Sequence, residues 1–254
     1  MELRSISDTG LCVTPIGFGA FKIGRNEKIK YPQPYDLPTE ETARSVVEGV
    51  VDLGVRFIDT APAYGLSEQR VGRFLADRPD IVVSTKVGEQ FDAGRSTYAY
   101  DRESVETSLD RSRQVLGRPV LDLVFVHSDG RDLDIQRDTD VIDVLRRQRD
   151  EGRIRAIGFS GKTPAGAHHA LKWADAIMVE YHAHDTSHDE AMRKAQDRRV
   201  AVIVKKGLAA GHLPAREAIS FVLCHPAVTS LVIGGLNLQH MAANIEAARQ
   251  VLEQ

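Results

Sequence analysis

The chain has 254 residues, enough for one large domain with a sizeable core. Hydrophobic residues make up 42% and charged residues 27%, as in ordinary soluble globular proteins, and the net charge of −3 gives no electrostatic reason to expect a nucleic acid or an anionic membrane as partner. Two cysteines cannot build a disulfide framework, and no apolar run is long enough to span a bilayer. The N-terminus also lacks a signal-peptide core, so we expect a cytoplasmic protein.

Short apolar runs alternate with longer segments of helical period along almost the whole chain. Each run is rich in Val and Ile and apolar on both faces, which is typical of parallel strands covered by helices. The predicted strands begin at Pro15, Arg56, Ile81, Leu121, Ile154, Ala176, Val200 and Ser230. The predicted helices begin near Thr39, Ser67, Asp101, Thr139, Thr163, Ser187, Pro214 and Asn237. Thr39 and Asp101 are the expected N-caps of the first and third helices.

Eight strand–helix units in about 250 residues predict a (β/α)8 TIM barrel, an α/β fold, as one domain over residues 1–254. The turn residues Asp8 to Gly10 predict an N-terminal β-hairpin that caps the bottom of the barrel. An open doubly wound sheet is the alternative, since alternation alone does not prove that the sheet closes.

Polar residues stand where three of the predicted strands end, which is where barrel enzymes hold their reactive groups. The second strand ends in Asp59, with Tyr64 five residues on, the third ends in Lys86, and the fourth ends in His127. A lysine after the apolar run IVVST must reach solvent or have a partner, and Asp59 on the neighbouring strand is the expected one. Taken singly, each of these residues is more often a cap or a solvated group. Their convergence at one mouth favours a functional site.

In the order and spacing of the motifs GFGAFKIG, FIDTAPAYGLSEQRVGRFL, STKVG, LDLVFVH and IGFS, the sequence resembles the aldo-keto reductase family. The resemblance implies a catalytic tetrad of Asp59, Tyr64, Lys86 and His127, a nicotinamide cofactor and a small carbonyl or alcohol substrate. Tyr64 would protonate the carbonyl oxygen, and a nearby Lys86 ammonium is expected to lower the pKa of that phenol. His127 would orient the carbonyl through a hydrogen bond.

The cofactor residues that the resemblance implies are only partly present. Ser160 is kept, but Gly161 and Met178 stand where the family usually has an Asn and a Gln for the nicotinamide carboxamide. At the end of the seventh strand, Lys205 occupies the position of an aromatic residue that usually stacks on the nicotinamide ring. We expect Lys206 to lie near the pyrophosphate, and Lys205 to turn toward a cofactor phosphate or the nicotinamide to bind differently. A solvated pair of lysines is the alternative.

After the eighth strand, the resemblance assigns Gly234, Gly235 and Asn244 to the cofactor. Backbone amides from Gly235 to Leu238 could meet a phosphate at a helix N-terminus, and an ordinary glycine-rich turn with Asn237 as N-cap is the equal alternative. The resemblance favours NADPH, while the missing basic residues in this segment leave NADH open.

Two loops carry further hypotheses. The loop FKIGRNEKIKYPQPYDLP after the first strand is a candidate for lining the substrate site, with a solvated loop as the alternative. In YHAHDTSH, the spacing of His182, His184 and His188 could ligate a divalent metal. A histidine-rich loop with Asp185 or Ser187 as a helix cap is the commoner outcome, so we assign no metal site.

Two other functional classes are open. The first is a Schiff-base lyase or aldolase with Lys86 or Lys205 as nucleophile. The second is a barrel that binds a nicotinamide cofactor without catalysis. The tetrad built around Tyr64 favours the reductase over both, and the sequence specifies neither the substrate nor an oligomeric state.

Overall fold

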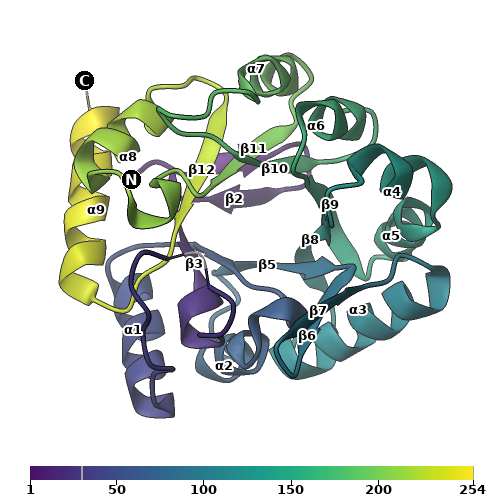
Figure 1. The fold of residues 1–254 in the computed structure, drawn as a ribbon, viewed down its shortest axis with the longest axis horizontal. Coiled ribbons are helices and arrows are strands. Elements are labelled where there is room, and N and C mark those ends of the chain that lie inside the picture. Colours follow the sequence, from purple (N-terminus) through teal and green to yellow (C-terminus); the bar gives the residue numbers. More distant parts are fainter. Residues whose placement is uncertain (30, 254) are drawn as a thin grey trace.

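The computed structural model describes residues 1–29 and 31–253. At its centre, eight parallel strands form a closed barrel in the order β10-β11-β12-β3-β4-β5-β8-β9 (Figure 1). This closed ring confirms the predicted (β/α)8 barrel and excludes the open doubly wound sheet. The strands are β3 (Ile16–Gly19), β4 (Phe57–Asp59), β5 (Val82–Val87), β8 (Leu121–His127), β9 (Ile154–Ser160), β10 (Ala176–Glu180), β11 (Ala201–Lys205) and β12 (Val228–Ile233).

Helices surround the barrel (Figure 1). They are α1 (Glu40–Asp52), α2 (Ser67–Phe74), α3 (Arg102–Leu116), α4 (Asp132–Asp138), α5 (Val141–Asp150), α6 (Pro164–Ala170), α7 (Asp189–Asp197), α8 (Ala215–Leu223) and α9 (Leu238–Leu252), with short 3-10 helices η1 (Ala20–Ile23), η2 (Pro62–Tyr64) and η3 (Ala209–Gly211). The predicted N-caps are confirmed, because Thr39 accepts a hydrogen bond from the Thr42 amide and Asp101 from the Ser104 amide. Within the described residues, no helix has both the length and the apolar character needed to cross a bilayer.

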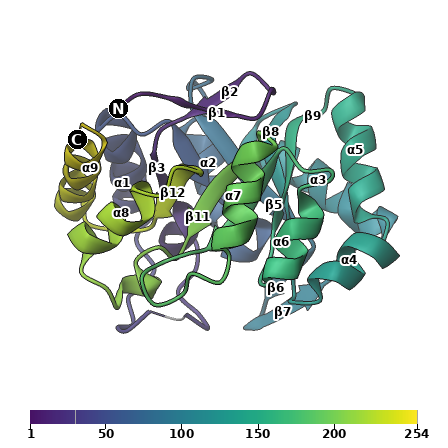
Figure 2. The same cartoon turned by 90° about the horizontal axis from the view of Figure 1, so that it is seen from above.

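Two β-hairpins lie at opposite ends of the barrel (Figure 2). The predicted N-terminal hairpin pairs β1 (Arg4–Ile6) with β2 (Leu11–Val13), and three of its apolar side chains pack against the barrel interior. A second hairpin pairs β6 (Glu89–Asp92) with β7 (Arg95–Tyr98) and follows directly from the end of β5. The first hairpin therefore closes the bottom of the barrel, while the second stands at the end where the strands finish.

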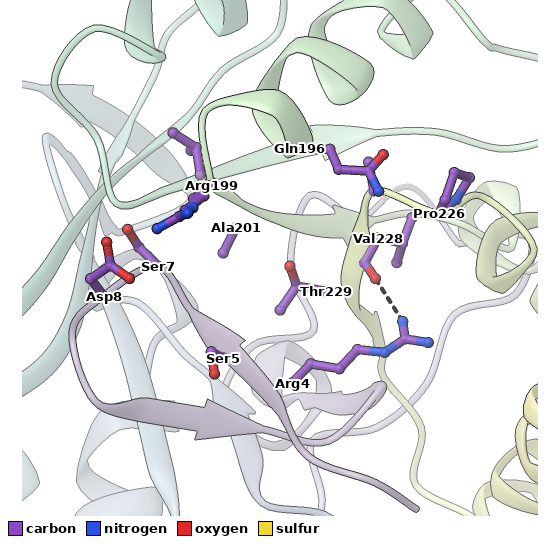
Figure 3. A pocket seen from close by; sticks show the side chains of 12 residues that line it. Arg4, Ser5, Ser7, Asp8, Gln196, Arg199, Ala201, Pro226, Val228 and Thr229 are labelled. Atoms are coloured by element: carbon purple, nitrogen blue, oxygen red, sulfur yellow. Dashed lines mark hydrogen bonds between the residues drawn. The ribbon is translucent and has the colours of Figure 1, made fainter.

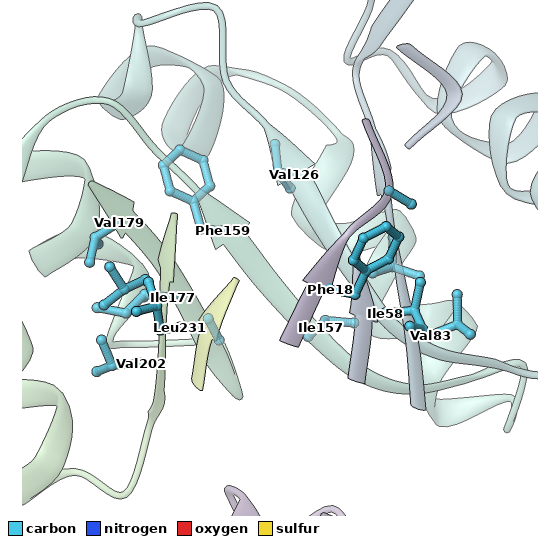
Figure 4. Close-up of a cluster of buried hydrophobic side chains, with 14 of the residues drawn as sticks. Phe18, Ile58, Val83, Val126, Ile157, Phe159, Ile177, Val179, Val202 and Leu231 are labelled. Carbon is cyan, nitrogen blue, oxygen red and sulfur yellow. The ribbon is translucent and has the colours of Figure 1, made fainter. Parts of the chain in front are cut away.

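The core has two layers, one on each side of the strands. Residues that face outward, such as Ile58, Ile157 and Val202, pack under the helices in one large apolar cluster (Figure 4). Residues that face inward, including Phe57, Phe125 and Ile203, fill the barrel together with the N-terminal hairpin. Because apolar side chains fill the interior, we expect the functional groups at the end of the barrel where the strands finish.

Candidate active site

Five polar side chains form the top layer of the barrel interior. Asp59, Lys86, His127, Ser160 and Lys205 each lie at or next to the end of a strand. In most of these strands the residue two positions earlier belongs to the apolar interior cluster, as Phe57, Phe125 and Ile203 do. Since side chains alternate along a strand, the polar residues point to the same side and lie directly above that cluster.

Asp59 and Lys86 form a buried ion pair. The Lys86 ammonium lies 2.7 and 2.8 Å from the two Asp59 carboxylate oxygens and also donates to the Thr60 carbonyl at 2.8 Å. The Ser84 hydroxyl donates to Asp59 Oδ1 at 2.8 Å. Only 1% of the Lys86 side chain is exposed, so the expected partnership with Asp59 is confirmed and fixes the position of the ammonium.

Tyr64 lies in η2 above this pair. The Lys86 Nζ atom is 4.7 Å from the centre of the Tyr64 ring and therefore approaches the face of the ring. Burial raises the pKa of the Tyr64 phenol well above 10, and the negative charges of Asp59 and Glu89 raise it further. The expected lowering of this pKa by Lys86 is therefore wrong, because burial and then the charges of Asp59 and Glu89 raise the pKa instead. Tyr64 holds its proton firmly.

His127 lies beside Tyr64, with 6.3 Å between the two ring centres. Its Nδ1 atom is 2.9 Å from Glu89 Oε2, although the ring is turned away from the direction of a linear hydrogen bond. Burial lowers the pKa of His127 and outweighs the opposing effect of Glu89. Burial raises the pKa of Glu89, but His127, Ser96 and Arg25 outweigh it and lower that pKa to about 2.

The sequence analysis missed Glu89. Glu89 is the first residue of the β6–β7 hairpin. The two short polar segments of this hairpin are joined by a turn at Ala93 and Gly94, both of which have positive φ, and the glycine in this turn is the sequence signal that could have predicted it. The hairpin places the Glu89 carboxylate against His127, so the site contains a second carboxylate besides Asp59.

The loop after β3 packs against the turn that carries Tyr64. The Phe21 ring meets the Tyr64 ring edge to face at 5.1 Å between centres, and Arg25 donates to the Ala63 carbonyl at 3.1 Å. A Cβ atom on Gly24 would lie 2.1 Å from the Tyr64 carbonyl oxygen, so only glycine permits this approach. These contacts favour the hypothesis that the loop lines the substrate site, with Lys30 outside the described residues.

The two consecutive lysines at the end of β11 diverge. Lys205 donates to the Ser160 hydroxyl at 2.9 Å and to the Gly161 carbonyl at 2.8 Å. Lys206 has a left-handed backbone (φ 55°), is exposed, and forms an ion pair with Glu180. Lys205 thus points toward Ser160, at one end of the predicted cofactor site, which we call the cradle, and its expected approach to a cofactor phosphate stays a prediction.

At the carboxamide side of the cradle, Gly161 stands where the family usually has an Asn, and the structure shows a steric reason for this. A Cβ atom on Gly161 would lie 2.8 Å from Oδ2 of Asp132, a buried carboxylate in α4. This same oxygen accepts hydrogen bonds from the Lys162 and Thr163 amides at 2.9 and 2.8 Å. An Asn side chain has no room at position 161, and Asp132 is a residue that the sequence analysis missed.

At the other side of the cradle, Asn237 is the N-cap of α9. Its side-chain oxygen accepts hydrogen bonds from the Gln239 and His240 amides, so the predicted alternative of a turn with Asn237 as N-cap is the one that forms. These bonds occupy two amide donors that a phosphate could otherwise use. A Cβ atom on Gly235 would meet nothing closer than 3.6 Å, so space remains there, whereas Gly234 lies against the Gly19 carbonyl.

The histidine-rich loop is held by its own contacts. His182 Nδ1 accepts from the His184 amide at 3.2 Å, and its Nε2 lies 3.5 Å from Glu180. The N-cap of α7 is His188, so neither cap expected at Asp185 or Ser187 forms. Within residues 1–29 and 31–253, no group of three or more histidine, cysteine or acidic side chains is arranged to hold a metal ion.

A cavity of about 570 Å³ lies at the opposite end of the barrel, between the N-terminal hairpin and the beginnings of β11 and β12 (Figure 3). Arg4, which donates to the Val228 carbonyl at 2.6 Å, is among the residues that line it. None of the candidate site residues borders this cavity. The chemistry of the site therefore belongs to the other face of the barrel.

The fold and the site define a TIM barrel whose tyrosine, lysine, aspartate and histidine meet at the carboxyl ends of the strands. The sequence model of the aldo/keto reductase family matches residues 15–218. The chain belongs to the aldo/keto reductase family.

Characterised relatives and a solved structure agree with this membership. The chain is 29% identical over 195 residues to a D-threo-aldose 1-dehydrogenase of a Pseudomonas species, covering 67% of this chain and 56% of that protein. It is 32% identical over 168 residues to an L-galactose dehydrogenase of Arabidopsis thaliana, covering 63% and 49%. The chain thus spans about half the length of these two relatives. A Pseudomonas aeruginosa protein described as an aldo-keto reductase has a TM-score of 0.91 and 36% identity, covering 98% of this chain and 95% of that one.

Proposed function

We propose that the chain is an NAD(P)-dependent oxidoreductase that interconverts an aldehyde or ketone with the matching alcohol. The observation that carries this proposal is the convergence of Tyr64, His127 and the Asp59–Lys86 pair above the apolar barrel interior. The Tyr64 phenol is protonated at neutral pH and lies beside the His127 imidazole, so it is placed to donate a proton to a carbonyl oxygen.

In this proposal each side chain has one task. Tyr64 donates its hydroxyl proton to the carbonyl oxygen in reduction and takes it back in oxidation. The Lys86 ammonium, held by Asp59 and the Thr60 carbonyl, stabilises the negative charge that develops on the phenolate. Since Nδ1 of His127 lies 2.9 Å from Glu89 Oε2, the Nε2 atom is the one left for the substrate oxygen. Phe21 and the loop that carries it shield the Tyr64 ring from water.

The nicotinamide group, when bound, would supply or accept the hydride. Ser160 and Lys205 offer a hydroxyl and an amine at the carboxamide end, in place of the usual amide side chains. Lys206, Gly234, Gly235 and Asn244 are the proposed contacts on the phosphate side, and Gly235 has room for a close approach. We propose NADPH as the cofactor because the family resemblance favours it, and NADH is the comparison in the experiment below.

The experiment is to titrate the protein with NADPH and NADH and then to measure turnover with Tyr64→Phe. We expect the variant to keep its affinity for the cofactor and to lose about 10²- to 10⁴-fold in kcat, as for the loss of a general acid. The panel should contain simple aldehydes and, because two relatives are named sugar dehydrogenases, aldoses. Tyr181→Phe, which alters a tyrosine stacked on Phe221, is the matched control. Undiminished turnover in Tyr64→Phe would refute the role of Tyr64.

A further inference from the structure

We propose that Lys205 is a nucleophilic amine that forms an imine with aldehydes or ketones entering the mouth of the barrel. Its Nζ atom lies at the open end of the interior, hydrogen-bonded to Ser160 Oγ and the Gly161 carbonyl. This activity needs no nicotinamide and therefore does not rest on the function proposed above.

The contacts of Lys205 differ from those of Lys86, the other candidate nucleophile, and from those of Lys206. Lys86 is paired with Asp59 at 2.7 Å and also donates to the Thr60 carbonyl, so its nitrogen is enclosed by acceptors and is not free to attack a carbonyl. Lys206 is paired with Glu180 and exposed. Both hydrogen-bond acceptors of Lys205 are uncharged, so nothing in direct contact with its nitrogen holds the proton there. Of the two lysines inside the mouth, Lys205 is the one suited to attack a carbonyl.

The strand register explains how Lys205 reaches this position. In the sheet, Lys205 of β11 pairs with Glu180 of β10, while Ser160 of β9 pairs with Met178, two residues lower on β10. The Lys205 side chain therefore crosses β10 and ends at Ser160, two strands away. Met178 is buried and offers no hydrogen-bonding amide, so the amine stands above an apolar floor.

The charges around Lys205 act in the same direction. Burial lowers the pKa of Lys205 to about 7, and the positive charges of Lys206 and Lys86 add to this, while Glu180 and Asp132 oppose it more weakly. His127 and His188 also face this group, and the charge of Lys205 in turn lowers both of their pKa values. Near pH 7 the unprotonated fraction is roughly a thousandfold larger than that of an ordinary lysine with a pKa near 10.4. Desolvation and a neighbouring cation are the two ways in which proteins activate a lysine amine.

The reaction is balanced without an oxidant or a reductant. The Nζ lone pair forms a bond to the carbonyl carbon as the C=O π bond breaks, and one amine proton passes to the oxygen. The resulting carbinolamine takes up a second proton on its oxygen and loses water, which leaves a protonated imine between Lys205 and the substrate, and loss of the remaining N–H proton gives the neutral imine. The Ser160 hydroxyl, 2.9 Å from Nζ, can relay these protons.

The experiment traps the imine with benzaldehyde and sodium cyanoborohydride near pH 7 in the cofactor-free protein, followed by peptide mapping of the benzyl label. We expect Lys205 to be labelled at least about tenfold faster than surface lysines such as Lys172, because of its larger unprotonated fraction. Lys205→Arg keeps a hydrogen-bonding cation that cannot act as the amine, and it should remove this fast label. Lys172→Gln, at an exposed position, should leave the label at Lys205 unchanged.

The outcomes distinguish this inference from the proposed redox function. Fast labelling at Lys205 that NADPH slows would support the imine and would also place the cofactor near this amine. Labelling of Lys205 no faster than that of Lys172, or fast labelling of Lys86 instead, would overturn the inference and leave the role of Tyr64 untouched. Loss of carbonyl turnover in every assay with fast labelling intact would refute the redox proposal and not this one.

Discussion

Replacing Lys205 with methionine should change how the stability of the protein depends on pH. In the folded protein, burial and the charges of Lys206 and Lys86 lower the pKa of Lys205 to about 7. In the unfolded chain the same amine has its ordinary pKa of about 10.4. Between these values the unfolded state binds a proton that the folded state does not. The free energy of unfolding of the wild type therefore falls by about 1.4 kcal/mol for each unit that the pH decreases across this window.

Summed over the window, the cost of protonating Lys205 in the folded protein is on the order of 5 kcal/mol, and this loss of stability is fully present below a pH of about 7. Methionine carries no charge and removes the cost. The substitution also takes a donor from Ser160 Oγ and the Gly161 carbonyl, at about 1 kcal/mol each and independently of pH. Lys205→Met should thus be more stable than the wild type by roughly 2 to 3 kcal/mol near pH 7, and this advantage should shrink and then reverse as the pH rises toward about 10, because the loss of the two hydrogen bonds does not depend on pH.

Urea unfolding followed by the fluorescence of Trp173, the single tryptophan and a buried one, measures the difference at pH values from about 6.5 to about 9.5. Titrating groups away from Lys205 are the same in both proteins and cancel in the difference, while His127 and His188, whose pKa values burial and to a lesser extent Lys205 lower, contribute only at the low end of this range. Lys172→Met, at an exposed position, controls for the loss of a lysine and should show no such dependence. A difference between the wild type and Lys205→Met that stays constant with pH would refute the reasoning.

Two further substitutions test the contacts around the site. Asp59→Asn leaves the buried Lys86 ammonium without its carboxylate, and we expect a loss of about 3–5 kcal/mol in the free energy of unfolding, measured by urea denaturation. A loss below about 1 kcal/mol would mean that the pair contributes little. Gly161→Asn restores the residue usual in the family, but its Cβ would meet Asp132 Oδ2 at 2.8 Å, so it should destabilise the protein by about 1–3 kcal/mol. A neutral or stabilising effect in the same assay would show that Asp132 moves aside.

The fold could be predicted because it depends on repeated local signals. Each barrel strand is an apolar run, and helix starts such as Thr39 and Asp101 follow from the hydrogen bond that a cap side chain accepts. Helix α4 and the β6–β7 hairpin were missed because they carry mostly polar residues and no apolar period. Each of these elements directly follows a barrel strand, and its position depends on tertiary contacts with the barrel.

The site was predictable where one residue implies a partner on a neighbouring strand. A lysine at the end of a buried strand requires a counter-charge, which identified Asp59 for Lys86. The contact of Glu89 with His127, and that of Asp132 with the Gly161 turn, depend on loop and helix positions that no sequence period encodes. The direction of the Tyr64 pKa shift was predicted wrongly for a related reason, because it depends mainly on the burial of the phenol and then on the charges of Asp59 and Glu89 around it.

The unusual residues of the cradle form one connected arrangement. Asp132 receives the amides that follow Gly161, and this requires a residue without a side chain at position 161. The Gly161 carbonyl and Ser160 hydroxyl then face the mouth of the barrel, where Lys205 donates to both across Met178. An amide at 178 would compete for the same acceptors, and an aromatic ring at 205 would leave both without a donor. The departures from the family pattern are therefore mutually dependent, which indicates a rebuilt polar site in which an amine takes the place of the usual amides.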